Sequence, residues 1–246
     1  MEDGFGDWRI AAVTTITADV PAAFLGGPSH KAGTPLFQSC LVQTEDNLNI
    51  GFTLPSSTAM ALNIAINAAL NAERCKAKIE YSKVLTPQGD GLAVKHENDD
   101  ALFDYFEQCM IAVTFAFQAV EVFCNHTIAR ELNEAIEVKR RKKRVTLSPL
   151  ELERQLSTEE KISIILPQIK GVPTPKGKKP WEAFKNLKVA RDSTIHMKNM
   201  DQQVIDKESL FFQFLSKDCE TFPQAAIAMI HYFLKGKEPR WLQKLI

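Results

Sequence analysis

The stretch from Asp100 to Val138, DALFDYFEQCMIAVTFAFQAVEVFCNHTIARELNEAIEV, contains neither glycine nor proline. Its apolar side chains recur at intervals of three or four residues, the spacing that places them on one face of a helix. The residues on this face are Leu102, Phe106, Met110, Val113, Phe117 and Val120. We therefore predict one long helix over residues 100–138. It ends in a run of cations at 139–144, which suits the negative end of a helix.

Three further helices are predicted after this one. Ser157 and Glu160 have the spacing of a capping box, in which the two side chains cap the start of a helix. Pro180 fits the first turn of the next helix, and Pro223 is expected to kink or divide the last one. The four predicted helices span 100–138, 157–169, 180–197 and 206–235. Together they indicate an all-helical bundle.

The first third of the chain has a different composition, because eight of the eleven glycines precede residue 92. Glycine at this density indicates turns and strands. The segments 39–44 and 48–54 flank Glu45-Asp46-Asn47 and predict a hairpin, and Ser56 or Ser57 is expected to cap a helix. We therefore predict a mainly α protein in two parts. The parts are a small mixed α/β N-terminal region over 1–96 and a helical bundle over 97–246.

Charge and cysteine usage exclude several classes of protein. Lys+Arg and Asp+Glu both number 30, so any attraction to nucleic acid must be local. The five cysteines are scattered without a Cys-x-x-Cys pair, which argues against a zinc site or a disulfide framework. The sequence has no P-loop, dinucleotide fingerprint or Gly-x-Ser-x-Gly motif. We expect neither a metal nor a cofactor.

The chain is also expected to be soluble and cytoplasmic. The N-terminal segment carries Glu2, Asp3 and Asp7 and no apolar stretch, unlike a signal peptide. The longest apolar segment, residues 110–123, is interrupted by Gln118 and Glu121, so we expect no membrane partner.

Residues 170–198 carry a local excess of positive charge, with eight bases against the two acids Glu182 and Asp192. The bases are Lys170, Lys176, Lys178, Lys179, Lys185, Lys188, Arg191 and Lys198. Such a patch can hold a polyanion through phosphate contacts, with an affinity that falls as salt rises. A solvated helix face beside a flexible loop would have the same composition, and the two interpretations stay open.

Arg191 and His196 in this patch are the minimum pair for cutting RNA without a metal. Histidine can take or give a proton near neutral pH, and arginine can hold the charge that builds on the attacked phosphate. Arg-x-x-x-x-His alone occurs by chance in many chains. Five residues separate the pair by about 140° on a regular helix. Either the helix ends or loosens between them, or a second chain completes the site.

Two segments resemble the signatures of HEPN domains (higher eukaryotes and prokaryotes nucleotide-binding). In PWEAFKNLKVARDSTIHMKN, an aromatic residue and a leucine precede Arg191, the polar Asp192 follows it, and His196 closes the motif. AFQAVEVFCNHTI is similar to the family's Glu-x-x-x-Asn helix, here Glu121 and Asn125. The resemblance covers about residues 97–235 and leaves the N-terminal part unmatched.

The resemblance implies an up-and-down helical bundle that dimerises, with the two Arg-x-x-x-x-His motifs facing each other. Many such domains are metal-independent endoribonucleases that act as bacterial toxins or antiviral effectors, with an antitoxin or inhibitor protein as a possible partner. Others bind nucleotides or serve as scaffolds without cutting RNA. Both kinds of function are carried forward, the endoribonuclease first and a non-catalytic dimeric nucleotide-binding, RNA-binding or interaction module as its alternative.

A dimer also satisfies the chemistry of RNA cleavage, which needs a base at the 2′-hydroxyl and an acid at the leaving oxygen. A two-fold axis beside the motif would bring a second His196 and a second Arg191. In this hypothesis Asp192 orients Arg191 or the histidine. The supporting residues Glu121 and Asn125 form a buried polar network that braces the motif. Lys185, Lys188 and Lys198 are expected to contact the RNA. Alternatively, Arg191 pairs with Asp192 or Glu182 at the surface, and His196 lies at the helix end near a carbonyl.

Overall fold

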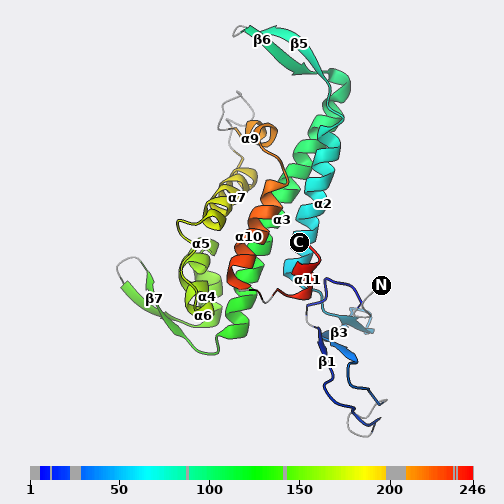
Figure 1. The fold of residues 1–246 in the computed structure, drawn as a ribbon, viewed down its shortest axis with the longest axis vertical. Coiled ribbons are helices and arrows are strands. Elements are labelled where there is room, and N and C mark those ends of the chain that lie inside the picture. Colours follow the sequence, from blue (N-terminus) through cyan, green and yellow to red (C-terminus); the bar gives the residue numbers. More distant parts are fainter. Residues whose placement is uncertain are drawn as a thin grey trace. The chain divides into compact units, whose positions relative to one another are not determined.

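The computed structural model describes residues 6–11, 13–22, 29–86, 89–140, 143–197, 209–234, 236 and 238–245. The chain divides into two compact units (Figure 1). The first unit comprises Met1–Met60 and Lys237–Ile246, and the second comprises Ala61–Gly236. This division falls within a helix and differs from the expected boundary near residue 97. Most of the helix and the hairpin that follows it belong to the second unit.

The prediction of a mainly α protein is confirmed, because helices make up most of the described chain and the strands form only small antiparallel pairs. In the first unit β1 (Val13–Thr15) pairs with β2 (Pro35–Phe37), and β3 (Ser39–Gln43) pairs with β4 (Asn49–Thr53). The hairpin predicted around Glu45-Asp46-Asn47 is therefore present as β3–β4. Asn47 has a φ of 61° in its turn, a conformation that asparagine tolerates better than most residues.

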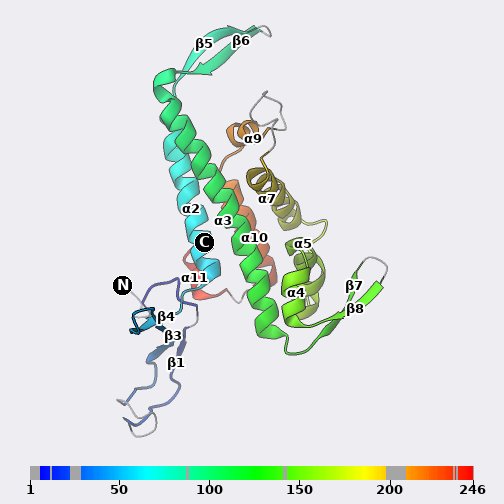
Figure 2. The same ribbon diagram turned by 180° about the vertical axis from the view of Figure 1, so that it is seen from behind.

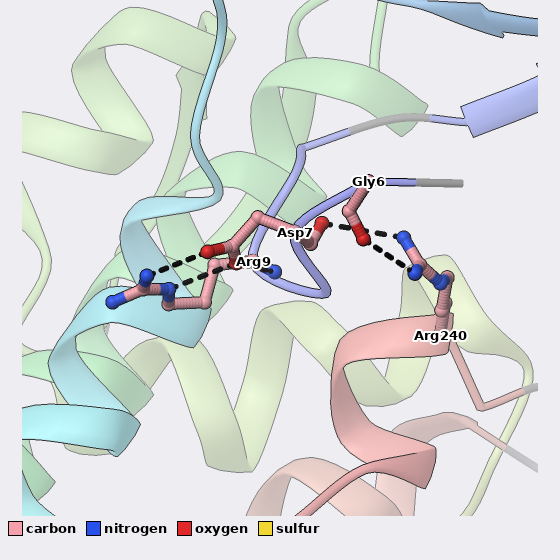
Figure 3. Close-up of polar contacts among 4 residues, drawn as sticks. All are labelled: Gly6, Asp7, Arg9 and Arg240. Carbon is pink, nitrogen blue, oxygen red and sulfur yellow. Dashed lines mark hydrogen bonds and ion pairs between the residues drawn. The ribbon is translucent and has the colours of Figure 1, made fainter. Parts of the chain in front are cut away.

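Within the first unit, the N-terminal segment is bonded to the C-terminal helix α11 (Arg240–Gln243), as Figure 3 shows. The Arg240 guanidinium donates hydrogen bonds to the carbonyl oxygens of Gly6 at 2.8 Å and Asp7 at 3.2 Å. The Asp7 carboxylate accepts two hydrogen bonds from the Arg9 side chain, at 2.9 and 2.6 Å. These bonds lower the pKa of Asp7 to about 2.

Helix α2 (Ser57–Lys76) begins where the sequence predicts, because the Ser56 hydroxyl accepts a hydrogen bond from the Ala59 amide at 3.2 Å. The next hairpin pairs β5 (Tyr81–Thr86) with β6 (Gly89–Val94).

The second unit is built around α3 (Asp99–Glu131), which follows a short 3-10 turn at His96–Asn98. Helices α7 (Lys179–Ile195) and α10 (Thr221–Leu234) pack against α3 and against each other. Figures 1 and 2 show these helices side by side from opposite directions. Phe117 of α3 stacks on Phe184 of α7 with ring centroids 5.9 Å apart, and both side chains are buried. The remaining helices are α4 (Pro149–Gln155), α5 (Thr158–Glu160), a π-helical turn (Lys161–Ile165), α6 (Leu166–Lys170) and α9 (Leu210–Ser216).

The predicted helix over 100–138 is too long at its C-terminal end. The helix stops at Glu131, and a hairpin of β7 (Ile136–Arg140) and β8 (Lys143–Leu147) follows. The described residues 139, 140, 143 and 144 of the basic run therefore lie in strands and not at a helix end, and residues 141 and 142 lie outside the described part of the chain. The physical reason is a change of period, because apolar and charged residues alternate from Ile136 onward, as in a half-buried strand. Val138 and Leu147 are 1% and 6% exposed.

The capping box of Ser157 and Glu160 is confirmed, with each side chain bonded to the other residue's amide. The helix predicted over 157–169 is present as α5, the π-helical turn and α6, and it ends at Lys170. A wider turn accommodates a proline that lacks an amide donor and would crowd the preceding turn of a regular helix. A second capping box, formed by Ser148 and Glu151, opens α4, which the sequence analysis missed.

The last predicted helix, over 206–235, is divided as expected, and residues 206–208 lie outside the described part of the chain. The break between α9 and α10 falls at residues 217–220, before Pro223. Pro223 occupies the first turn of α10, where its missing amide hydrogen would have had no helical acceptor.

Among the described helices, the segment His96–Glu131 is the one that is long and apolar enough to cross a membrane. In this fold it is the central helix of the bundle, and its buried residues include Val113, Ala116 and Val120. A core helix passes the same test of length and composition, so this finding is consistent with a soluble protein.

Tyr105→Phe is expected to destabilise the bundle by about 1–2 kcal/mol, because the Tyr105 hydroxyl is buried and donates to the Phe214 carbonyl at 2.6 Å. Phenylalanine fills the same space but leaves this carbonyl without its donor. Urea unfolding of the parent and the variant measures the difference. The control is Tyr81→Phe, at a tyrosine that is 45% exposed. Equal stability of Tyr105→Phe and the parent would show that the hydrogen bond contributes nothing.

Candidate functional site

Helix α7 carries the Arg-x-x-x-x-His motif, and its buried face fixes how the motif is presented. This face consists of Trp181, Phe184, Leu187, Ala190 and Thr194, at intervals of three or four residues. Arg191 follows directly after a buried position, and 27% of its side chain is exposed. The packing of α7 on α3 therefore holds Arg191 at the edge of the helix interface.

The Arg191 guanidinium lies over an aromatic ring of α3. Its central carbon is 3.9 Å from the ring centroid of Phe117, a distance typical of a cation–π contact. Nη1 of Arg191 forms an ion pair with Oδ1 of Asp192 at 3.0 Å. The Nε atom is buried and has no hydrogen-bond partner among the described residues. Arginine has five N–H donors, so the guanidinium keeps donors beyond the one that faces Asp192.

His196 lies immediately after the end of α7. The helix ends at Ile195, and the His196 backbone leaves the helical conformation with φ −118° and ψ 55°. Its amide donates to the Asp192 carbonyl at 3.0 Å, while its side chain is exposed. The helix therefore ends between Arg191 and His196. In this single chain, no hydrogen bond or ion pair joins these two described side chains.

The lysines that the sequence assigns to RNA binding have partners within the protein. Lys185 bonds Glu159 at 3.0 Å, and Lys188 bonds Oδ2 of Asp192 at 2.6 Å. Asp192 thus holds Lys188 with one oxygen and Arg191 with the other. Lys198 lies outside the described residues. The positive charge around α7 that is not paired with an acid is consequently smaller than the number of its basic residues indicates.

Glu121 and Asn125 lie one and two turns after Phe117 on the same face of α3. Glu121 accepts a hydrogen bond from the Thr158 hydroxyl at 3.4 Å. Asn125 accepts one from Nζ of Lys161 at 2.8 Å. The two half-buried residues therefore contact the segment that precedes α6, and among the described residues their hydrogen bonds do not reach Arg191 or His196.

Lys161 is the residue of this cluster that the sequence analysis missed. Its side chain is only 1% exposed, and its Nζ atom also donates to the Glu153 carbonyl at 2.7 Å. Lys161 lies in the π-helical turn, beside the buried Cys124. Burial raises the pKa of the Cys124 thiol to about 12, with Lys161 lowering and Glu121 raising it. The available signal was a single cation at the head of the apolar run KISIIL.

One face of α3 therefore organises the candidate site. It carries Phe117 under Arg191, then Glu121 beside Thr158, then Asn125 beside Lys161. Chemically, the site offers a fixed guanidinium for an anion and, at the end of α7, an accessible imidazole for proton transfer. Within the described ranges, no group of three His, Cys, Asp or Glu side chains is arranged to hold a metal ion.

The first unit contains a separate pocket of about 520 Å³. Ile10, Phe37, Pro55 and Met60 form most of its apolar wall, and Asp7 and Arg9 lie at its polar side. Because these two charged side chains already bond each other, the described lining of the pocket offers mainly apolar surface.

Comparisons with protein-family models, with curated proteins and with solved structures found no match. The resemblance to HEPN domains therefore rests on the two sequence signatures.

Proposed function

We propose that this protein is a metal-independent endoribonuclease of a bacterial defence or toxin type, with an active site shared across a homodimer. The observation that carries the proposal is the pair at the end of α7. The Arg191 guanidinium is fixed on Phe117 while 27% of its side chain stays exposed, and the exposed His196 follows five residues later, just beyond the end of α7. Both groups have the chemistry that RNA cleavage requires.

In the proposed reaction, one His196 takes the proton of an RNA 2′-hydroxyl. The 2′-oxygen then attacks the adjacent phosphorus, and the bond from phosphorus to the 5′-oxygen breaks. The second His196, on the partner chain, gives its proton to the leaving 5′-oxygen. Both Arg191 side chains stabilise the negative charge on the phosphate during the attack. The products are a 2′,3′-cyclic phosphate and a 5′-hydroxyl.

The surrounding residues have positioning roles in this proposal. Asp192 orients Arg191 through their 3.0 Å ion pair. Glu121 and Asn125 brace the bundle from the same face of α3 that carries Phe117. Lys185, Lys188 and Lys198 would contact RNA only where they exchange an internal partner for a phosphate. The cytoplasm, where RNA is available, is the proposed location, and an antitoxin or inhibitor protein is the proposed partner.

The alternative is a non-catalytic dimeric module that binds nucleotides, RNA or another protein. One observation favours it, namely that Arg191, Lys185 and Lys188 all have partners within the chain. In that case the motif stabilises the packing of α7, and substitution of His196 changes no activity.

A subunit-mixing experiment tests whether the site is shared. Co-expression of equal amounts of parent and His196→Ala chains yields about one quarter parent homodimers if chains pair at random. Because a shared site needs both histidines, we expect cleavage to fall to about one quarter of the parent value at equal total protein. Two independent sites would retain about one half. A monomeric parent, measured by light scattering, would contradict the shared site directly.

A further inference from the structure

The hairpin formed by β7 and β8 carries more unneutralised positive charge than helix α7. Six consecutive cations occupy residues 139–144, and Glu137 is the sole acid between Ile136 and Leu147. Arg144 pairs with Glu137 at 3.0 Å, yet their side chains stay 75% and 56% exposed. Such an exposed ion pair contributes little and is screened by salt.

The strand register places one cation directly opposite another. Lys139 faces Arg144 across the hairpin, and strand alternation places Lys143 on the other face. Like charges in facing positions destabilise a hairpin. An anion bound between them removes this repulsion. Arg141 and Lys142 lie outside the described residues, so the strands alone carry this observation.

The lysines of α7 provide the contrast. Lys185 and Lys188 are engaged by Glu159 and Asp192. Lys139 and Lys143 are exposed, and within the described part of the chain neither side chain has a hydrogen bond or an ion pair. Of these two pairs of described lysines, the pair in the hairpin is therefore the one that is free to bind a polyanion.

The base of the hairpin is anchored in the second unit. Val138 and Leu147 are buried, at 1% and 6% exposure, on the face that also carries Lys143 and is opposite to Lys139 and Arg144. The capping box of Ser148 and Glu151 joins β8 directly to α4. Figures 1 and 2 show the hairpin extending away from the helices beside α4. An anchored arm of this kind presents its cations without a large loss of conformational entropy on binding.

We propose that the β7–β8 hairpin is an RNA-binding arm. Lys139 and Arg144 on one face, and Lys143 on the other, contact phosphates of the RNA backbone. The choice of RNA as the ligand rests on the proposed function. The proposal extends that function by identifying the surface that binds the substrate. Contacts to phosphates give affinity without sequence specificity. Base recognition is therefore not a property of this arm.

The test measures binding in a His196→Ala background, so that the RNA stays intact. A fluorescein-labelled RNA stem-loop is titrated at several salt concentrations with the full chain and with a Lys139→Gln/Lys143→Gln variant. Each lost phosphate contact reduces the slope of log binding constant against log salt concentration by about one unit. For the double variant we therefore expect this slope to decrease by about two units. We also expect its RNA affinity at 0.1 M salt to fall roughly tenfold or more. The matched control is Lys78→Gln/Lys83→Gln, which removes two exposed lysines elsewhere in the second unit.

Two results would contradict the proposal of an RNA-binding arm. One is equal RNA affinity of the hairpin variant and the control variant. The other is the absence of RNA binding by the His196→Ala chain. Binding to phosphatidylserine vesicles without binding to RNA would assign the charge to a membrane surface instead. The experiment also distinguishes failure of this proposal from failure of the cleavage proposal. If only the cleavage proposal fails, the parent leaves RNA uncut while RNA binding still depends on the hairpin. Circular dichroism of each variant verifies that the fold is retained.

Discussion

His196→Ala is expected to lower the rate of RNA cleavage by at least about 10²-fold and up to about 10⁴-fold. A positioned general acid or base contributes this range to a reaction, and in a shared site the substitution removes both. His196 is exposed at the end of α7, so the variant should unfold at the same urea concentration as the parent. The loss would then belong to the chemistry and not to the fold.

The matched control is His126→Ala, at an exposed histidine of α3 whose side chain has the same chemistry. Initial rates on one labelled RNA, with parent and both variants at equal concentration, measure the effect. We expect the control to keep the parent rate within a factor of about two, because no role in proton transfer is assigned to it. Equal loss in both variants would contradict a specific role for His196.

Lys161→Ala is expected to lower the free energy of unfolding by about 2–4 kcal/mol. The substitution leaves the Asn125 side-chain oxygen and the Glu153 carbonyl without a donor, and each unpaired buried acceptor costs about 1–3 kcal/mol. It also removes the buried apolar stem of the lysine, at about 0.8 kcal/mol per methylene. Release from the cost of burying an ammonium offsets part of this loss.

Lys161→Met separates these contributions, because methionine keeps an apolar stem and removes only the donors. We expect about 1–2 kcal/mol of destabilisation from this variant. Urea unfolding measures the free energy of unfolding of each variant, and we expect the slope of this free energy against urea concentration to be unchanged. The control is Lys179→Ala, at an exposed position of α7. A Lys161→Met variant more stable than the parent would show that burying the ammonium costs more than its hydrogen bonds return.

Local patterns were sufficient to predict the features that depend on neighbouring residues. The β3–β4 hairpin and the starts of α2 and α5 follow from turn residues and capping serines within a few positions. The end of α3 was missed because the change to strand period after residue 131 spans only a few residues. Such a segment is too short for periodicity to outweigh the preceding helical pattern.

The site was less accessible from sequence, because its contacts join distant segments. The position of Arg191 over Phe117 depends on the rotation of α7 against α3, which the α7 pattern alone does not fix. The bonds of Lys185 and Lys188 changed the interpretation of the basic patch for the same reason. Lys161 satisfied the rule that a buried charge needs partners, but its partners could be identified only in the folded chain.

The most direct measurement of the central claim is the cleavage of structured and unstructured RNA by the purified parent in the presence of EDTA, with analysis of the product ends. The account predicts cutting by the parent but not by His196→Ala, with 2′,3′-cyclic phosphate and 5′-hydroxyl ends. DNA of the same sequence should stay intact because it lacks the 2′-hydroxyl. RNA left whole by a folded, dimeric parent, or cut equally by His196→Ala, would contradict the account.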